Sequence, residues 1–70
     1  MICPDSGKGP LDKRIKEAAE IYLEKEGGMW PKICRVPEEL LRGKDYPHVP
    51  GIKVVPDPSI RPGVFVLRMT

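Results

Sequence analysis

The longest periodic run of apolar positions lies in the first third of the chain. Four residues at intervals of three and four form one stripe of a helix: Leu11, Ile15, Ala18 and Tyr22. Pro10 suits the first turn of that helix, because its missing N–H needs no partner there. Gly27 and Gly28 supply a stop signal after the last charged turn. The pattern therefore predicts a helix over residues 10–26.

Three later segments have the β-branched or apolar composition of short strands: residues 32–36, 51–55 and 64–69. Between the first two, residues 37–43 begin with Pro, continue with acids and end at Gly, which predicts a short helical turn. The last two strands are neighbours in sequence and flank a segment rich in turn-forming residues, so we expect them to pair antiparallel. Residues 1–9 show no periodicity and are predicted to form a flexible N-terminal arm.

Together these elements predict one small domain over residues 1–70, of the α+β class. An amphipathic helix packs on a small, mainly antiparallel sheet of about three strands, with the helical turn between the first and second strands. The expected core comprises Leu11, Ile15, Ala18, Tyr22, Ile33, Leu40, Ile52, Val54, Phe65 and Leu67. A chain this short buries only about 60% of its unfolded surface, so such domains often depend on a disulfide, a metal or self-association.

The final strand is apolar on both faces. One face carries Phe65, Leu67 and Met69, and the other carries Val64 and Val66. One helix covers only one face of a sheet, so this strand is expected to be central, with its second face under loops or against a partner chain. Val64 and Val66 form a candidate interaction surface, to which Trp30 either adds an aromatic anchor or serves instead as a lid on the core. This pattern favours a non-enzymatic protein-interaction or self-assembly module, with a homodimer as one form.

The positive charges of the chain suggest an alternative function. Four cations surround the start of the predicted helix: Lys8, Lys13, Arg14 and Lys16. Such a group is typical of surfaces that contact nucleic-acid phosphates. The net charge of +2 is small for this class of protein, and the sequence holds no known recognition motif. Nucleic-acid binding through the helix N-terminus is therefore the second hypothesis.

Catalytic and metal-binding chemistry form the third class. A cysteine nucleophile would need Cys3 or Cys34 beside His48, the only histidine, and no local signature of such a pair is present. Two Cys and one His also leave a zinc site without a fourth ligand, and their spacing matches no zinc motif. Cys34, in a predicted strand, is most simply a core residue. We expect no enzyme activity, no catalytic residue, no cofactor and no metal.

The sequence also bears on where the protein works. It contains no apolar stretch of about 20 residues and no secretory signal pattern, so no membrane association is expected. Two cysteines without close spacing are expected to stay reduced, which favours a cytoplasmic protein. A charged fraction of 31% without Asn or Gln favours an origin in a heat-adapted organism. The nine prolines lower the entropy lost on folding wherever the native geometry fits them.

The second half of the chain also carries a family resemblance. Residues 51–58, which read GIKVVPDP, and residues 62–67, which read PGVFVL, cover about a quarter of the sequence. This part resembles the ends of short uncharacterised proteins from bacterial genomes and prophages. The resemblance implies a family without an assigned activity, and it assigns no role to any residue.

Overall fold

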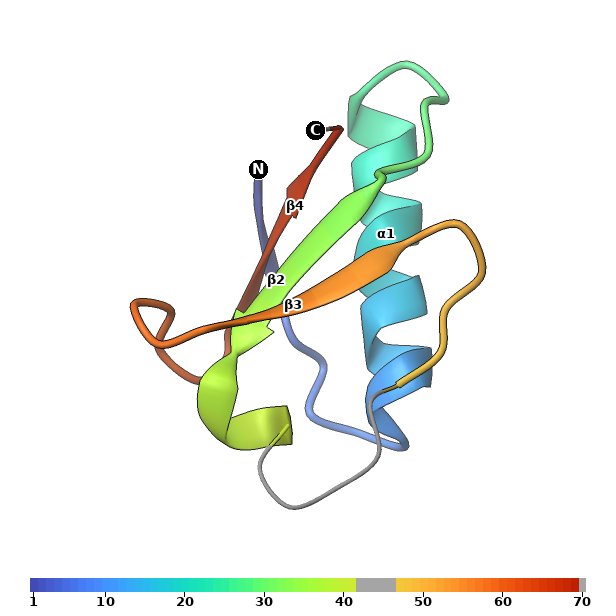
Figure 1. The fold of residues 1–70 in the computed structure, drawn as a ribbon. Coiled ribbons are helices and arrows are strands. Elements are labelled where there is room, and N and C mark those ends of the chain that lie inside the picture. The colour runs from blue at the N-terminus through green and yellow to red at the C-terminus, as the bar shows by residue number, and fades with distance from the viewer. Residues whose placement is uncertain (42–46, 70) are drawn as a thin grey trace.

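In the computed structural model, which describes residues 1–41 and 47–69, one α-helix packs against a four-stranded sheet (Figure 1). In chain order the elements are β1 (Ile2–Pro4), α1 (Leu11–Lys25), β2 (Ile33–Pro37), the 3₁₀ helix η1 (Glu38–Leu41), β3 (Lys53–Asp57) and β4 (Val64–Arg68). The predicted α+β class is confirmed. The helix and the three predicted strands lie close to their expected positions. So does the described part of the helical turn predicted over residues 37–43, whose last two residues lie outside the described ranges.

The strand order in the sheet is β1-β4-β2-β3. β4 is antiparallel to both β1 and β2, whereas β2 and β3 are parallel. The predicted antiparallel pairing of residues 51–55 with residues 64–69 is therefore wrong. β4 takes a central place because both of its faces are apolar, whereas β3 carries Lys53 and Pro56, residue types that suit a sheet edge.

The first strand corrects the prediction of a flexible arm over residues 1–9. Ile2–Pro4 forms an edge strand that pairs with Val64–Val66, and the Leu67 N–H donates to the Met1 carbonyl at 2.8 Å. This strand has only three residues and its partner lies near the other end of the sequence. A local pattern therefore carries no signal for it.

The segment between β1 and α1 is held by an ion pair. The Arg14 Nε donates to Asp5 Oδ1 at 2.8 Å, and Arg14 Nη2 pairs with Asp5 Oδ2. The Gly7 N–H donates to the same Oδ1 at 2.9 Å. These hydrogen bonds, the one from Arg14 above all, lower the pKa of the Asp5 carboxyl. The side chains of Arg14 and Asp5 are only 17% and 6% exposed, so the pair fixes the chain to α1.

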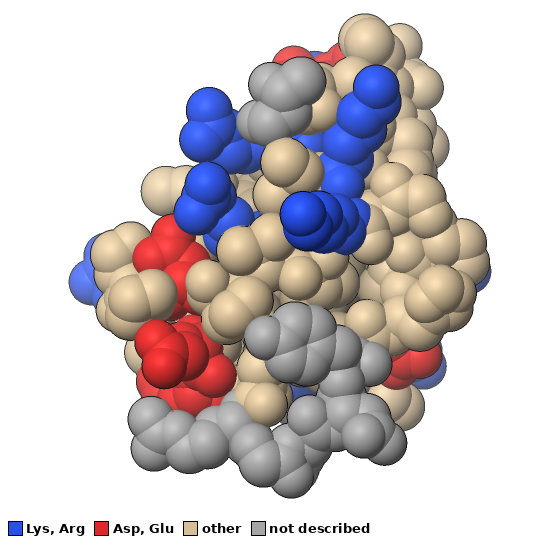
Figure 2. Space-filling model, in the orientation of Figure 1, with Lys and Arg blue, Asp and Glu red and all other residues tan. Residues whose placement is uncertain are grey.

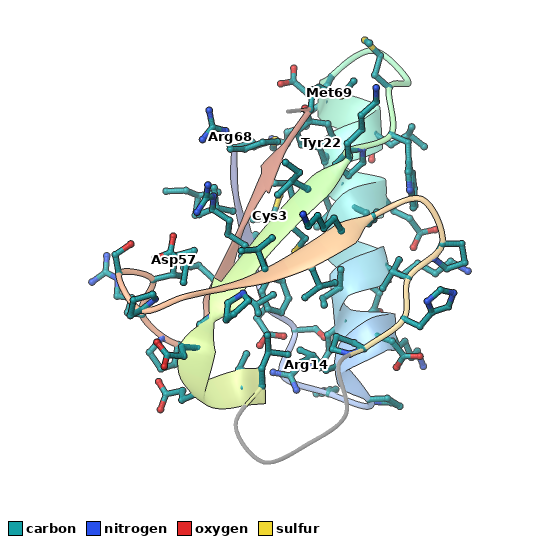
Figure 3. All side chains as sticks on the ribbon, in the orientation of Figure 1. Cys3, Arg14, Tyr22, Asp57, Arg68 and Met69 are labelled. Atoms are coloured by element: carbon teal, nitrogen blue, oxygen red, sulfur yellow. The ribbon has the colours of Figure 1, made fainter. Side chains whose placement is uncertain are left out.

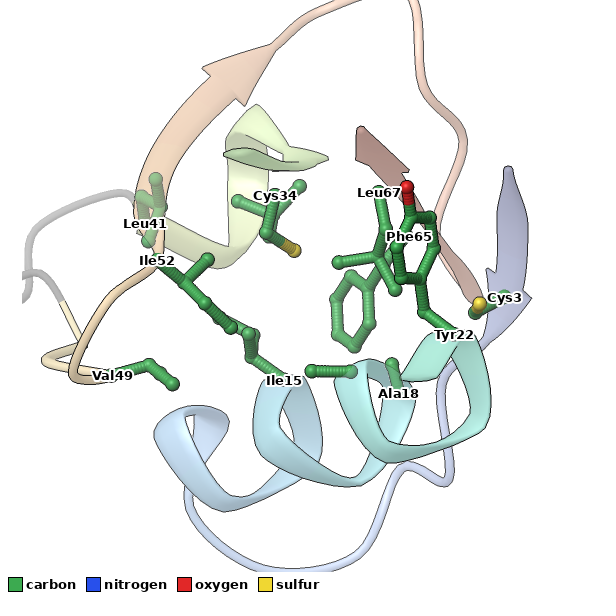
Figure 4. Packing of buried hydrophobic residues seen from close by; sticks show 12 residues of the cluster. Cys3, Ile15, Ala18, Tyr22, Cys34, Leu41, Val49, Ile52, Phe65 and Leu67 are labelled. Carbon is green, nitrogen blue, oxygen red and sulfur yellow. The ribbon is translucent and has the colours of Figure 1, made fainter. Parts of the chain in front are cut away.

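The core lies between α1 and one face of the sheet (Figure 4). α1 contributes Ile15, Ala18, Ala19 and Tyr22, and the strands contribute Cys3, Cys34, Val36, Phe65 and Leu67. Leu41 of η1 and Val49 and Ile52 of the segment before β3 close the core near the start of α1. The described parts of the connection between β2 and β3 therefore cover the same face of the sheet as the helix.

The predicted core is confirmed in most positions. Ile15, Ala18, Tyr22, Ile52, Phe65 and Leu67 are buried, and Leu11, Leu40 and Val54 are half-buried against them. Ile33 is the exception, because Cys34 and Val36 of the same strand point toward α1 and alternation turns Ile33 to the other face. Within the described residues, no helix combines the length and apolar composition needed to cross a lipid bilayer.

Candidate functional site on the open face of the sheet

The face of the sheet turned away from α1 is the candidate site. Alternation along the strands gives this face the residues that neighbour the inward-facing ones: Ile2, Pro4, Ile33, Arg35, Lys53, Val55, Asp57, Val64, Val66 and Arg68, together with Pro37, which is itself buried. We call this set the open face. The described α-helix lies wholly on the other side of the sheet (Figure 1). Apolar side chains of the open face consequently remain within reach of a partner.

The strand register arranges these side chains in rows. The middle row runs across all four strands through Ile2, Val66, Arg35 and Val55. The next row toward the start of β2 contains Arg68, Ile33 and Lys53. In the middle row Ile2 is 68% exposed, while Val66 and Val55 are half-buried. The centre of the open face is therefore apolar, with one arginine in it.

A shallow hollow extends the apolar centre toward the β3–β4 connection. It is lined by Ile2, Ser59, Ile60, Arg61, Val64 and Val66. The turn that builds one wall is fixed by Asp57, whose Oδ1 accepts hydrogen bonds from the Ser59 N–H at 2.8 Å and the Ser59 hydroxyl at 2.6 Å. These two bonds, followed by Arg35, lower the pKa of the Asp57 carboxyl. Asp57 therefore carries its charge at neutral pH.

Charge on the open face changes sign along β2. Lys53 and Arg68 flank Ile33 near the start of the strand, whereas η1 places Glu38 and Glu39 after its end. Figure 2 shows a group of Lys and Arg side chains in the upper half of the view and Asp and Glu side chains at its lower left. Figure 3 labels Arg68 at the basic end and Asp57 at the border toward the acidic end.

At the border between the two ends, an ion pair joins β2 to β3. Arg35 Nη1 lies 3.4 Å from Asp57 Oδ2. The two side chains are 40% and 18% exposed, so the arginine can still contact a molecule placed over the face. The open face is thus apolar at its centre, with positive charge at one end of its strands and negative charge at the other.

The structure separates the three residues of the predicted interaction surface. Val64 and Val66 lie on the open face, as expected for a central strand. Trp30 packs against the core and lies beside Gly51, with ring atoms 3.6 Å from the position of a Cβ on that glycine. The indole therefore belongs to the covered side of the sheet. Ile2 and Val55 join the valines instead.

The four cations of the nucleic-acid hypothesis differ in exposure and pairing. Lys8, Lys13 and Lys16 are exposed near the start of α1, but Arg14 is paired with Asp5. None of the four lies on a strand, so this basic group is separate from the open face. Within the described residues no aromatic ring lies on the open face, which leaves it without a surface for base stacking.

The cysteines occupy the covered face. Cys3 and Cys34 are fully buried free thiols on β1 and β2, with β4 between them. Strands two positions apart are separated by about 9–10 Å, beyond the roughly 7 Å that a disulfide tolerates between Cα atoms. Burial raises the pKa of the Cys34 thiol to about 12 and also raises that of Cys3. Neither thiol is therefore prepared for nucleophilic attack, which requires a thiolate.

The other groups considered for chemistry are dispersed. The His48 side chain is exposed in the loop before β3, whereas both thiols are sealed in the core. Across residues 1–41 and 47–69, no three His, Cys, Asp or Glu side chains gather in a way that could hold a metal ion.

Comparison of the chain with protein-family models, with curated proteins and with solved structures finds no match. The resemblance of residues 51–58 and 62–67 to short bacterial and prophage proteins therefore stays a prediction.

Proposed function

We propose that this chain is a small non-enzymatic protein-interaction module that binds through the open face of its sheet. The observation that carries the proposal is the position of β4: a central strand, apolar on both faces, of which α1 covers only one. An exposed apolar patch rimmed by charges is typical of a surface that a partner covers. Val64, Val66 and Ile2 form its centre.

The energetics support a binding role for these residues. Each 100 Å² of apolar surface that a partner removes from water contributes about 2.5 kcal/mol. Ile2 is 68% exposed and the valines are half-buried, so folding leaves part of their apolar surface unused. Arg35 and Asp57 in the same face would orient a partner, since charged groups mainly determine specificity.

Nucleic-acid binding is the competing proposal, supported by the exposed Lys8, Lys13 and Lys16. It predicts a salt-dependent mobility shift with short DNA or RNA that reversal of these lysines to Glu abolishes. The interaction-module proposal predicts no shift at physiological salt. A mobility shift that persists when these lysines are replaced by Glu, but is lost in Val66→Glu, would instead indicate that nucleic acid binds to the open face.

The proposal places the module in the cytoplasm of a heat-adapted organism. Two buried thiols that cannot bridge within the chain suit a reducing compartment. Nine prolines and the lack of Asn and Gln support heat adaptation. Thermal melting tests the second point, because a midpoint in the range typical of mesophile domains, about 45–65 °C, would contradict it.

Site-specific photo-crosslinking in the native host tests the interaction surface. p-Benzoylphenylalanine is placed in turn at Val55, on the open face, and at Glu20, which is exposed on the outer side of α1. We expect defined crosslinked protein species from position 55 and none above background from position 20. Both variants should melt like the parent, since neither position is buried.

The comparison of the two positions decides the outcome. Equal crosslinking from positions 55 and 20, or none from either, would contradict the proposal. Mass spectrometry of the species from position 55 then identifies the partner, which is the subject of the inference that follows.

A further inference from the structure

We infer that the partner of the open face is a second copy of this chain, bound face to face about a two-fold axis that lies between the two sheets, over the part of β4 between Val64 and Val66. The inference rests on the proposed function and names its partner. It follows from the order of charges along the strands and from the apolar residues between them.

The charge pattern is complementary to itself under a two-fold rotation. One end of the open face is basic, with Lys53 and Arg68, and the other is followed by Glu38 and Glu39. A two-fold axis in the plane of the interface and perpendicular to the strands reverses the strand direction of the second copy. The basic end of each copy then lies over the acidic end of the other, and both contacts are attractive.

The same axis matches the apolar centre to itself. Val64 and Val66 point to the open face from positions two residues apart in β4. A rotation about a line between them sets Val66 of each copy against Val64 of the other. The rotation also brings Arg35 of one copy near Asp57 of the second copy, at the border where each already pairs with its own partner.

The size of the face sets the strength of this dimer. Four strands about 4.8 Å apart, with about five residues of 3.3 Å each, give a flat footprint of roughly 300 Å² before side-chain relief is counted. Stable specific interfaces begin near 600 Å² of accessible surface per partner, so this face is small enough to place the contact among weak interfaces. We therefore expect a weak dimer that forms at about 100 μM or above, with two sheets about 10 Å apart as in a β-sandwich.

Analytical ultracentrifugation of paired charge reversals tests the inference. The variant Lys53→Glu/Arg68→Glu makes both ends of the face acidic, and the variant Glu38→Lys/Glu39→Lys makes both ends basic. Each alone should dimerise at least about tenfold more weakly than the parent, because both end contacts become repulsive. An equimolar mixture should recover the dimer, because every end contact between the two variants is attractive.

Lys13→Glu/Lys16→Glu serves as the matched control. It changes the net charge as much as the acidic variant does, but both lysines lie on α1, on the far side of the sheet. Its dimerisation should equal that of the parent. Melting curves of all variants show whether each is folded before its association is compared.

The outcomes separate this inference from the proposed function. A parent protein that stays monomeric up to about 500 μM would overturn the inference. The proposed function would still hold if position 55 crosslinked to a different protein. A parent dimer that the mixed variants fail to restore, or that the control weakens equally, would overturn the two-fold arrangement.

Discussion

The two faces of β4 both carry apolar residues, but they differ in how far those residues are buried. Phe65 and Leu67 are fully buried beneath α1, whereas Val64 and Val66, on the other side of the same strand, are half-buried. The difference arises because α1 and the described parts of the β2–β3 connection lie on the same side of the sheet, and residues 1–41 and 47–69 contain no second α-helix. The buried apolar surface is therefore concentrated on the covered face, and under the proposed function the open face binds a partner.

The largest expected effect comes from truncating one side chain to Ala on each face of β4. Phe65→Ala removes a fully buried ring and should cost about 3–5 kcal/mol, enough to unfold much of so small a domain. Val66→Ala on the open face should cost far less, about 1 kcal/mol, in the monomer. Urea unfolding followed by tryptophan fluorescence measures both. Equal losses at the two positions would show that the open face is covered within the monomer.

The two ion pairs give a second comparison. Asp5 and Arg14 are mostly buried on the covered side, so Asp5→Asn should lower the free energy of unfolding by about 1–3 kcal/mol. Asp57→Asn should cost less, because Arg35 is 40% exposed and the solvent screens the pair. Denaturant unfolding at neutral pH checks the order, and a larger loss for Asp57→Asn would contradict it.

Acid should affect the same pairs. Folding lowers the pKa of Asp5 and Asp57, so the unfolded chain binds protons more readily and stability falls as the pH drops. Their contribution is complete above about pH 5 and is lost as the pH falls through and below about 4. Melting temperatures between pH 6 and pH 3 should fall less steeply in Asp5→Asn than in the parent. Identical slopes would mean that the Asp5–Arg14 pair adds no stability.

The rates of thiol labelling compare local opening at the edge of the sheet, at Cys3, with opening at its centre, at Cys34. Both cysteines are sealed, so labelling requires opening of the structure. β1 is a three-residue edge strand, whereas β2 has a neighbour on each side, so Cys3 should react about tenfold faster than Cys34 in native conditions. Mass spectrometry of the labelled chain gives both rates. Equal rates would indicate that only global unfolding exposes either thiol.

The smallest effect is expected from a polar substitution on the open face. Ile33→Thr keeps a β-branched side chain at a half-buried position, so the monomer should lose less than about 1 kcal/mol. If Ile33 belonged to the core, as the sequence alone predicts, the loss would be several times larger. Differential scanning calorimetry at low protein concentration measures the change.

The sequence was sufficient for features that depend on neighbouring residues. The stripe from Leu11 to Tyr22 identifies α1 and its buried face. The apolar residues on both faces of β4 identify a central strand. Both follow from periodicity within a single segment. The class of the fold, the core positions on α1 and the candidate role of Val64 and Val66 were accessible for this reason.

Features that depend on pairing between distant segments were not accessible. β1 is too short to produce a pattern, and β3 pairs in parallel with β2 instead of antiparallel with β4, the next strand in the chain. Ile33 was assigned to the wrong face because its strand offers apolar residues on both faces. Arg35 and Asp57 become neighbours only through the β2–β3 register, so the separation of positive from negative charge along the open face appears only in three dimensions.

The place of β4 in the sheet has a consequence during biosynthesis. β4 follows every other described element in the chain, yet it provides the hydrogen-bonding partner for both β1 and β2. On the ribosome, α1 and the first three strands emerge before the strand that joins them, so the sheet cannot close until translation has passed β4. The apolar stripe of α1 therefore has no complete sheet to pack against until β4 has emerged.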